Sequence, residues 1–136
     1  MRNSKIKQNI SPRLSDIIKH KGKQRFIDEV FSQIEAAYGI DNINDILHVG
    51  GSVAKIMEGL IDKVPKDLDL TTKDEKLFHF LQKYARKIFP NYRIDIRKKR
   101  VIIDNGYFVT EIWLDKSGYQ IIEINGLKLQ DYGQHK

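Results

Sequence analysis

The chain has 136 residues, which suffices for one domain with a single hydrophobic core. Hydrophobic residues make up 40% of it and charged residues 31%, as in ordinary globular domains, so the composition excludes a disordered chain. No apolar stretch approaches the roughly 20 residues of a membrane span, and the polar, basic residues 1–10 are unlike a secretory signal. Cysteine is absent, which excludes disulfides and thiolate metal sites and suits the reducing cytoplasm, where we expect the protein to act.

The net charge of +6 predicts an anionic partner such as NTP, RNA or DNA. Lys and Arg concentrate in residues 1–25 and 93–100, and two local patches favour an anion track over an even, solubilising scatter. Most basic residues of the second patch are nevertheless interpreted as a solvated strand face. They are Arg93, Arg97, Lys98, Lys99 and Arg100.

Helices are predicted first along the chain. Ser11-Pro12 is typical of a helix start, so we expect a short helix through residues 17–18 that ends near Gly22. A second helix ends at Gly39. Its apolar residues recur at the spacing of one helical face: Phe26, Ile27, Val30, Phe31, Ile34, Ala37 and Tyr38.

Strand signals begin at residues 46–49, a short apolar run that predicts a buried strand entering the turn Gly50-Gly51-Ser52. Residues 53–59 then predict a short helix for which Ser52 is placed as the cap. Residues 66–70 alternate charge and leucine, as a strand does.

A long helix follows, opened by the capping-box spacing of residues 72–75 and ended by Pro90. Three strand-like segments come next, at residues 92–104, 107–115 and 119–125, separated by the good hairpin turns Asn105-Gly106 and residues 116–118. We therefore expect an α+β fold with a mixed, mostly antiparallel sheet and helices packed on one face.

The domain organisation follows from this order of elements. We expect one domain over residues 1–136, with a basic helical segment at 1–45, a catalytic core at 46–125 and a polar tail at 126–136.

Gly50, Gly51 and Ser52 form the first candidate site, at the transition from a strand to a helix. Glycines let the backbone turn sharply and approach a ligand. The following helix start presents unpaired N–H groups, to which the Ser52 hydroxyl adds a donor. These three residues are candidates for binding the phosphates of a nucleotide, although such a turn by itself is most often only a turn.

Asp67 and Asp69 form the second candidate site. Aspartate is disfavoured within strands, and the i, i+2 spacing places both carboxylates on one face while Leu68 and Leu70 point into the core. The two like charges repel each other, and Mg²⁺ would compensate because it binds carboxylate and phosphate oxygens together. The other interpretation of this pattern is a solvated strand edge.

In combination, residues 50–59 (GGSVAKIMEG) and 65–72 (PKDLDLTT) resemble the head-domain signature of the DNA polymerase beta-like nucleotidyltransferase superfamily. The nearest likeness is to the tRNA CCA-adding enzyme and bacterial poly(A) polymerase branch, which has Gly-Gly-x-Val-Arg-Asp and, later, Pro-x-Asp-apolar-Asp-apolar and Thr. This resemblance implies that Gly51 and Ser52 contact the triphosphate of an NTP substrate, and that Asp67 and Asp69 bind Mg²⁺ or Mn²⁺.

The superfamily also implies a third carboxylate, on a strand beside that of the two aspartates. Glu123 matches the branch best, because it follows a hairpin turn and is an acid among isoleucines that would need a partner if buried. Asp95 is the second candidate, since simpler members carry this acid on the first strand after the helix, and Glu111 is the third. Arg93 and Arg97 could instead make Asp95 a structural ion pair.

The predicted function is transfer of an NMP from an NTP to a hydroxyl acceptor, RNA (tRNA) or a protein. Small stand-alone members of the superfamily include toxin–antitoxin components that modify tRNA or a partner protein. Two departures support the alternative of a catalytically inactive module that binds nucleic acid or a partner protein. Ala54-Lys55 replace the branch's Arg-Asp, and the branch's helical domains for base selection and RNA binding are missing, which a second protein chain could supply.

Overall fold

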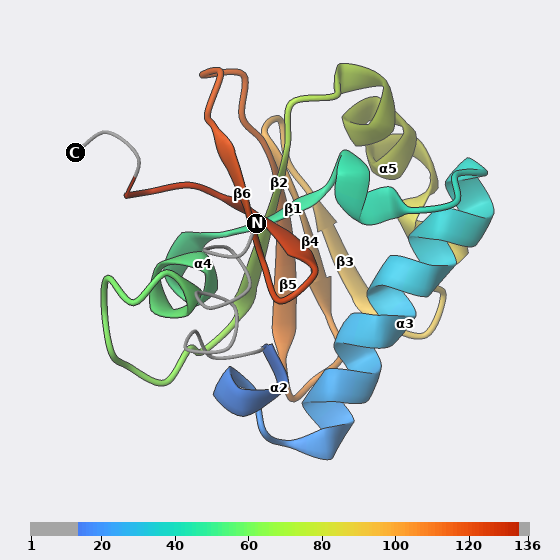
Figure 1. Ribbon diagram of the computed structural model, residues 1–136. Coiled ribbons are helices and arrows are strands. Elements are labelled where there is room, and N and C mark those ends of the chain that lie inside the picture. Colours follow the sequence, from blue (N-terminus) through green and yellow to red (C-terminus); the bar gives the residue numbers. More distant parts are fainter. Residues whose placement is uncertain (1–13, 134–136) are drawn as a thin grey trace.

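The structure, a computed structural model, describes residues 14–133, which form helices packed against a seven-stranded sheet (Figure 1). The helices are α2 (Leu14–Ile17), α3 (Lys21–Tyr38), the 3₁₀ helix η1 (Ile43–Asp45), α4 (Gly51–Met57) and α5 (Glu75–Ile88). The strands are β1 (His48–Gly50), β2 (Leu68–Thr72), β3 (Arg93–Ile96), β4 (Arg100–Asp104), β5 (Val109–Leu114), β6 (Ile121–Ile124) and β7 (Leu127–Gln130). The helix start expected at Ser11-Pro12 lies outside the described residues.

The strands form one mixed sheet in the order β3-β4-β5-β2-β1-β7-β6. Neighbouring strands are antiparallel except for β2–β5 and β1–β7, which are parallel. The predicted α+β class with a mixed, mostly antiparallel sheet is therefore confirmed. Among residues 14–133, no helix combines the length and apolar character needed to cross a membrane.

The two faces of the sheet differ, because successive side chains of a strand point to opposite sides. In β2, Leu68 and Leu70 are fully buried in the core that α3, α4 and α5 complete, whereas Asp69 between them is only half-buried. The same face is buried in the neighbouring strands β1 and β5, because Val49 and Ile112 lie opposite Leu70 and are buried too. The carboxylate-bearing face is thus the one turned away from the helical core.

The ends of the long helices follow local chemistry. Gly39 ends α3 with φ 79°, as predicted, because glycine adopts this left-handed conformation without strain. The start of α5 differs from the predicted capping box: Asp74, not Thr72, is the cap, and its Oδ1 accepts hydrogen bonds from the N–H groups of Lys76 and Leu77. Thr72 instead ends β2, which extends two residues beyond the expected strand.

The C-terminal strands depart from the expected three-strand meander. Residues 92–104 form two strands, β3 and β4, around a tight turn in which the Arg97 N–H donates to the Arg100 carbonyl. After β5 the chain crosses to the far edge of the sheet, so that β2 and not β6 lies beside β5. The expected tail contains β7, which Asn125 (φ 54°) and Gly126 (φ 80°) join to β6 in a tight hairpin turn.

Candidate active site

The glycine turn and Asp69 meet in the folded chain. Strands β1 and β2 are antiparallel with Gly50 directly opposite Asp69. Gly51 has φ +59°, and a Cβ built on it would lie 2.1 Å from Asp69 Oδ2, so only glycine fits there. Helix α4 begins at this residue with Gly50 as its cap, and Ser52 therefore lies within the helix and is not the cap that was expected.

The charge of Asp69 is only partly compensated, by Trp113 and Arg100. Its carboxyl group is half-buried, and burial raises its pKa above the ordinary value. The charge of Asp67, which immediately precedes β2, raises that pKa further. A weak hydrogen bond from Trp113 Nε1 to Asp69 Oδ1, 3.4 Å long, opposes the shift without cancelling it. A cation bound here would relieve this cost.

Glu111 is the acid that the fold places beside Asp69. The parallel pairing of β2 with β5 sets Glu111 directly opposite Asp69, on the same face of the sheet. Its carboxylate forms an ion pair with Arg100 of β4, with Nη1 and Oε1 2.7 Å apart. The Arg100 guanidinium also lies 4.8 Å from the centre of the Trp113 ring. Glu111 is thus held next to the aspartates, with its charge balanced by Arg100.

The other two candidates for the third carboxylate lie far from Asp69. The expectation that Glu123 occupies a strand beside β2 is wrong: β6 is an edge strand, separated from β2 by β7 and β1. Three strand spacings amount to about 14 Å. Glu123 is exposed, although the isoleucines that flank it are half-buried (Ile122) and buried (Ile124). The flanking isoleucines therefore did not indicate a buried acid.

Asp95 lies on β3, at the opposite edge of the sheet. Its carboxylate is 2.7 Å from Arg97 Nη2, and the hydrogen bond from this guanidinium lowers the pKa of Asp95. This is the structural ion pair that the sequence left open as its alternative role.

Tyr132 is a site residue that sequence reasoning missed. Its hydroxyl accepts a hydrogen bond of 2.7 Å from the Gly51 N–H and donates one of 3.0 Å to Gln130 Oε1. The Lys55 ammonium lies 4.9 Å from the centre of its ring. Glu58 anchors the same segment by accepting from the backbone N–H groups of Tyr132 and Gly133. No local pattern marks Tyr132, because only the pairing of β7 with β1 brings it to the glycine turn.

A cavity of about 380 Å³ lies between Gly51, Asp69 and Tyr132, and Asp67 and Glu111 are not part of its lining. Its lining is Gly51, Asp69, Thr71, Trp113, Leu114, Asp115, Gln130 and Tyr132. Polar side chains line it on Asp69, Thr71, Asp115 and Gln130, so the cavity suits a polar occupant.

A divalent cation fits part of this arrangement. Carboxylates are the ligands that Mg²⁺ prefers, and Asp69 has a raised pKa that a cation would relieve. Within residues 14–133, however, no three Asp, Glu, His or Cys side chains already converge as a metal centre. The carboxylate of Glu111, the acid opposite Asp69, is paired with Arg100.

His48, just before the turn, is a packed residue. It is 3% exposed, its Nε2 donates to the Asp45 carbonyl (3.0 Å), and its Nδ1 accepts from the Tyr119 hydroxyl (2.7 Å). Burial is the largest effect on its pKa, which is lowered.

No protein-family model, no curated protein and no solved structure matches the chain. Membership of the nucleotidyltransferase superfamily therefore stays a prediction, and the geometry of the site is what supports a function.

Proposed function

We propose that the chain is a metal-dependent nucleotidyltransferase that moves an NMP from an NTP to a hydroxyl acceptor and releases pyrophosphate. The observation that carries this proposal is the contact between the glycine turn and Asp69, where a Cβ at Gly51 would collide with the carboxylate. A site of this kind can hold a triphosphate and its metal ion at one point, because backbone and carboxylate lie within reach of the same ligand.

Asp67 and Asp69 would hold Mg²⁺ or Mn²⁺, with Glu111 next to them in the register of the sheet. The ion would supply neutralisation of the phosphate charge and activation of the attacking hydroxyl. In the reaction the acceptor oxygen forms a bond to the α-phosphorus and gives up its proton to solvent. The bond from the α-phosphorus to the oxygen that bridges to the β-phosphate breaks, and pyrophosphate leaves. The half-buried position of Asp69 limits the access of water to its carboxylate.

The charges of the site agree with this role. Asp69 and Glu111 lie opposite each other in the sheet, and Arg100 balances Glu111 through its 2.7 Å ion pair. The charge of Asp67 raises the pKa of Asp69, so the two aspartates leave negative charge that a divalent cation would compensate. Arg100 thereby positions Glu111 and lowers its repulsion toward the aspartates.

For the acceptor, we propose RNA, with tRNA foremost, or a protein, in a toxin–antitoxin setting. The basic turn between β3 and β4 supports an anionic acceptor, because Lys98 and Lys99 are exposed there and Arg100 begins the strand beside Glu111. A second protein chain that contributes acceptor-binding parts belongs to the same proposal.

A catalytically inactive binding module is the second candidate. It is favoured by the lack of a preformed metal centre within the described residues. The replacement of Arg-Asp by Ala54-Lys55 points the same way: Ala54 is fully buried, and Lys55 lies over the Tyr132 ring.

A transfer assay separates the two candidates. The full chain is incubated with Mg²⁺, each of four α-³²P-labelled NTPs, and either bulk tRNA or the protein alone. We expect labelled tRNA or protein, with the signal lost on chelation of Mg²⁺ and reduced at least about a hundredfold in Asp69→Asn. Glu111→Gln is expected to lose most of the activity, whereas Glu123→Gln, the matched control at the sheet edge, keeps it.

Two results would contradict the enzyme. One is the absence of transfer with every NTP together with thermal stabilisation of the protein by RNA in EDTA, which favours the inactive module. The other is transfer that Asp69→Asn leaves unchanged, which places any activity outside this site.

A further inference from the structure

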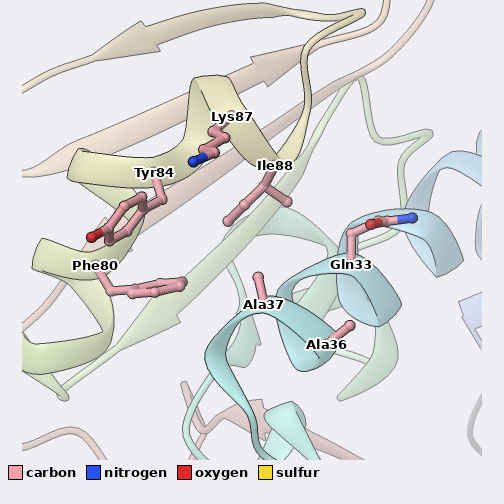
Figure 2. A pocket seen from close by; sticks show the side chains of 7 residues that line it. All are labelled: Gln33, Ala36, Ala37, Phe80, Tyr84, Lys87 and Ile88. Atoms are coloured by element: carbon pink, nitrogen blue, oxygen red, sulfur yellow. The ribbon is translucent and has the colours of Figure 1, made fainter.

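A second hollow lies among the helices, on the side of the sheet away from the carboxylates. This α3–α5 groove has a volume of about 540 Å³ (Figure 2). Its lining is Gln33, Ala36 and Ala37 of α3 and Phe80, Tyr84, Lys87 and Ile88 of α5. In Figure 2 the large side chains of α5 stand on one side and the two alanines on the other. None of these residues belongs to the candidate active site.

The apolar wall of the groove is a regular stripe along α5. Phe80, Tyr84 and Ile88 are spaced four residues apart and therefore share one face of the helix. All three are only half-buried. Aromatic contacts hold the stripe in place: the ring of Phe80 lies 5.0 Å from that of Tyr38 and 4.9 Å from that of Tyr84. The stripe is thus preorganised, which reduces the entropic cost of binding.

The floor of the groove is open where α3 contributes the small side chains of Ala36 and Ala37. Ala36 and Ala37 are both exposed and line the groove. Elsewhere the same helix buries large residues, among them Val30 and Ile34, against the core. The groove therefore lies along a helix pair that is otherwise well packed.

Charge beside the groove has one sign. From Lys76 to the end of α5 at Ile88 the sequence contains no acid, and the basic ridge Lys83 and Lys87 is exposed beside the apolar stripe. Neither lysine takes part in the four ion pairs found in the described part of the chain. The α3 side of the groove, with Gln33 and the two alanines, is uncharged. A ligand in the groove would meet positive charge along one flank only.

We propose that the α3–α5 groove binds an amphipathic helix of a partner protein. Apolar side chains at i, i+3 or i+4 and i+7 of that helix would enter beside Phe80, Tyr84 and Ile88. Acidic side chains along one flank of the helix would face the basic ridge, which fixes its orientation. A nucleic-acid backbone could bind to the basic ridge but would make no favourable contact with the apolar stripe. An amphipathic helix with an acidic flank contacts both.

This inference is independent of the proposed catalytic function, because it concerns another face of the molecule. Its test is selection from a displayed library of 18-residue amphipathic helices, with the full chain as bait. The library fixes leucines at spacings of three and four, and randomises both flanks among Glu, Gln and Lys. We expect the selected helices to carry Glu on one flank.

Binding is then measured by fluorescence anisotropy with the best selected helix as the probe. Ala37→Trp fills the groove at an exposed position and is expected to weaken binding at least about tenfold. The double reversal Lys83→Glu, Lys87→Glu is expected to weaken binding about tenfold and to restore it for the same helix with its Glu flank changed to Lys. The matched control, Lys98→Glu with Lys99→Glu at the β3–β4 turn, is expected to bind as the wild type does.

Circular dichroism melts verify that each variant is folded before its affinity is compared. The proposal is overturned if no helix is selected, if selected helices show no acidic flank, or if Ala37→Trp binds them unchanged. It is also overturned if the chain is a dimer in solution that Ala37→Trp converts to a monomer, since the occupant is then a second copy. Duplex RNA that competes with the helix for the wild type but not for Ala37→Trp would overturn it in favour of a nucleic acid.

Discussion

Replacement of Asp69 by asparagine is expected to stabilise the protein in the absence of divalent metal. Asp69 is half-buried, and its pKa is raised first by burial and then by the charge of Asp67. In the folded chain the ionised carboxylate is therefore a cost at neutral pH. Asparagine keeps the oxygen that accepts the hydrogen bond from Trp113 and removes the charge.

The size of the effect follows from the spacing of the two aspartates. Carboxylates two residues apart on a strand lie about 7 Å apart, and like charges at that distance repel by about 2 kcal/mol at an effective dielectric constant of about 20. Asp67 is partly exposed, and solvent screening reduces the repulsion to about 1 kcal/mol. For a chain of 136 residues, that corresponds to a rise in Tm of about 3–6 °C.

The assay is urea unfolding of the wild type and Asp69→Asn at pH 7.5 in EDTA. It is repeated with about 10 mM Mg²⁺, a concentration that exceeds the dissociation constants of ordinary Mg²⁺ sites. The variant should be the more stable in EDTA, and Mg²⁺ should raise the stability of the wild type only. Glu123→Gln is the matched control, and its stability should change by less than about 0.5 kcal/mol because Glu123 is exposed. A variant no more stable than the wild type in EDTA would refute the reasoning from repulsion and burial.

Three further outcomes are expected. Gly51→Ala should lower the free energy of unfolding by about 2–4 kcal/mol, because the new Cβ would meet Asp69 Oδ2 at 2.1 Å in a left-handed backbone. The control is Gly39→Ala, which also has a left-handed backbone but open space around it. In the same urea experiment it should cost only about 1 kcal/mol. Tyr132→Phe should cost about 1 kcal/mol by removing the hydrogen bond to the Gly51 N–H; a stability equal to the wild type's would mean that this bond contributes nothing. The pKa of His48 is lower in the folded chain than in the unfolded chain, so as the pH falls His48 is protonated first in the unfolded chain. Protonation therefore favours unfolding, and stability should be lost as the pH falls below about 6.5. Urea midpoints at pH 7.5 and 5.5 should show this loss, and His48→Gln should reduce it.

Local sequence signals located the two parts of the candidate site. The strand, turn and helix around Gly50 and Gly51 were predicted from residue types alone, because tight turns and buried strands are chosen by nearby residues. The alternation of Asp67 and Asp69 with leucines likewise predicted which side of β2 would face the core, since side chains alternate along any strand.

Tertiary structure alone decided what stands next to those residues. Glu111 lies opposite Asp69 because β5 pairs with β2 in parallel, and this pairing depends on how the whole sheet is ordered. The same ordering carried Glu123 to an edge and brought Tyr132, from the expected tail, onto the glycine turn. Strand order is fixed by contacts between segments distant in sequence, so no local pattern in a single chain records it.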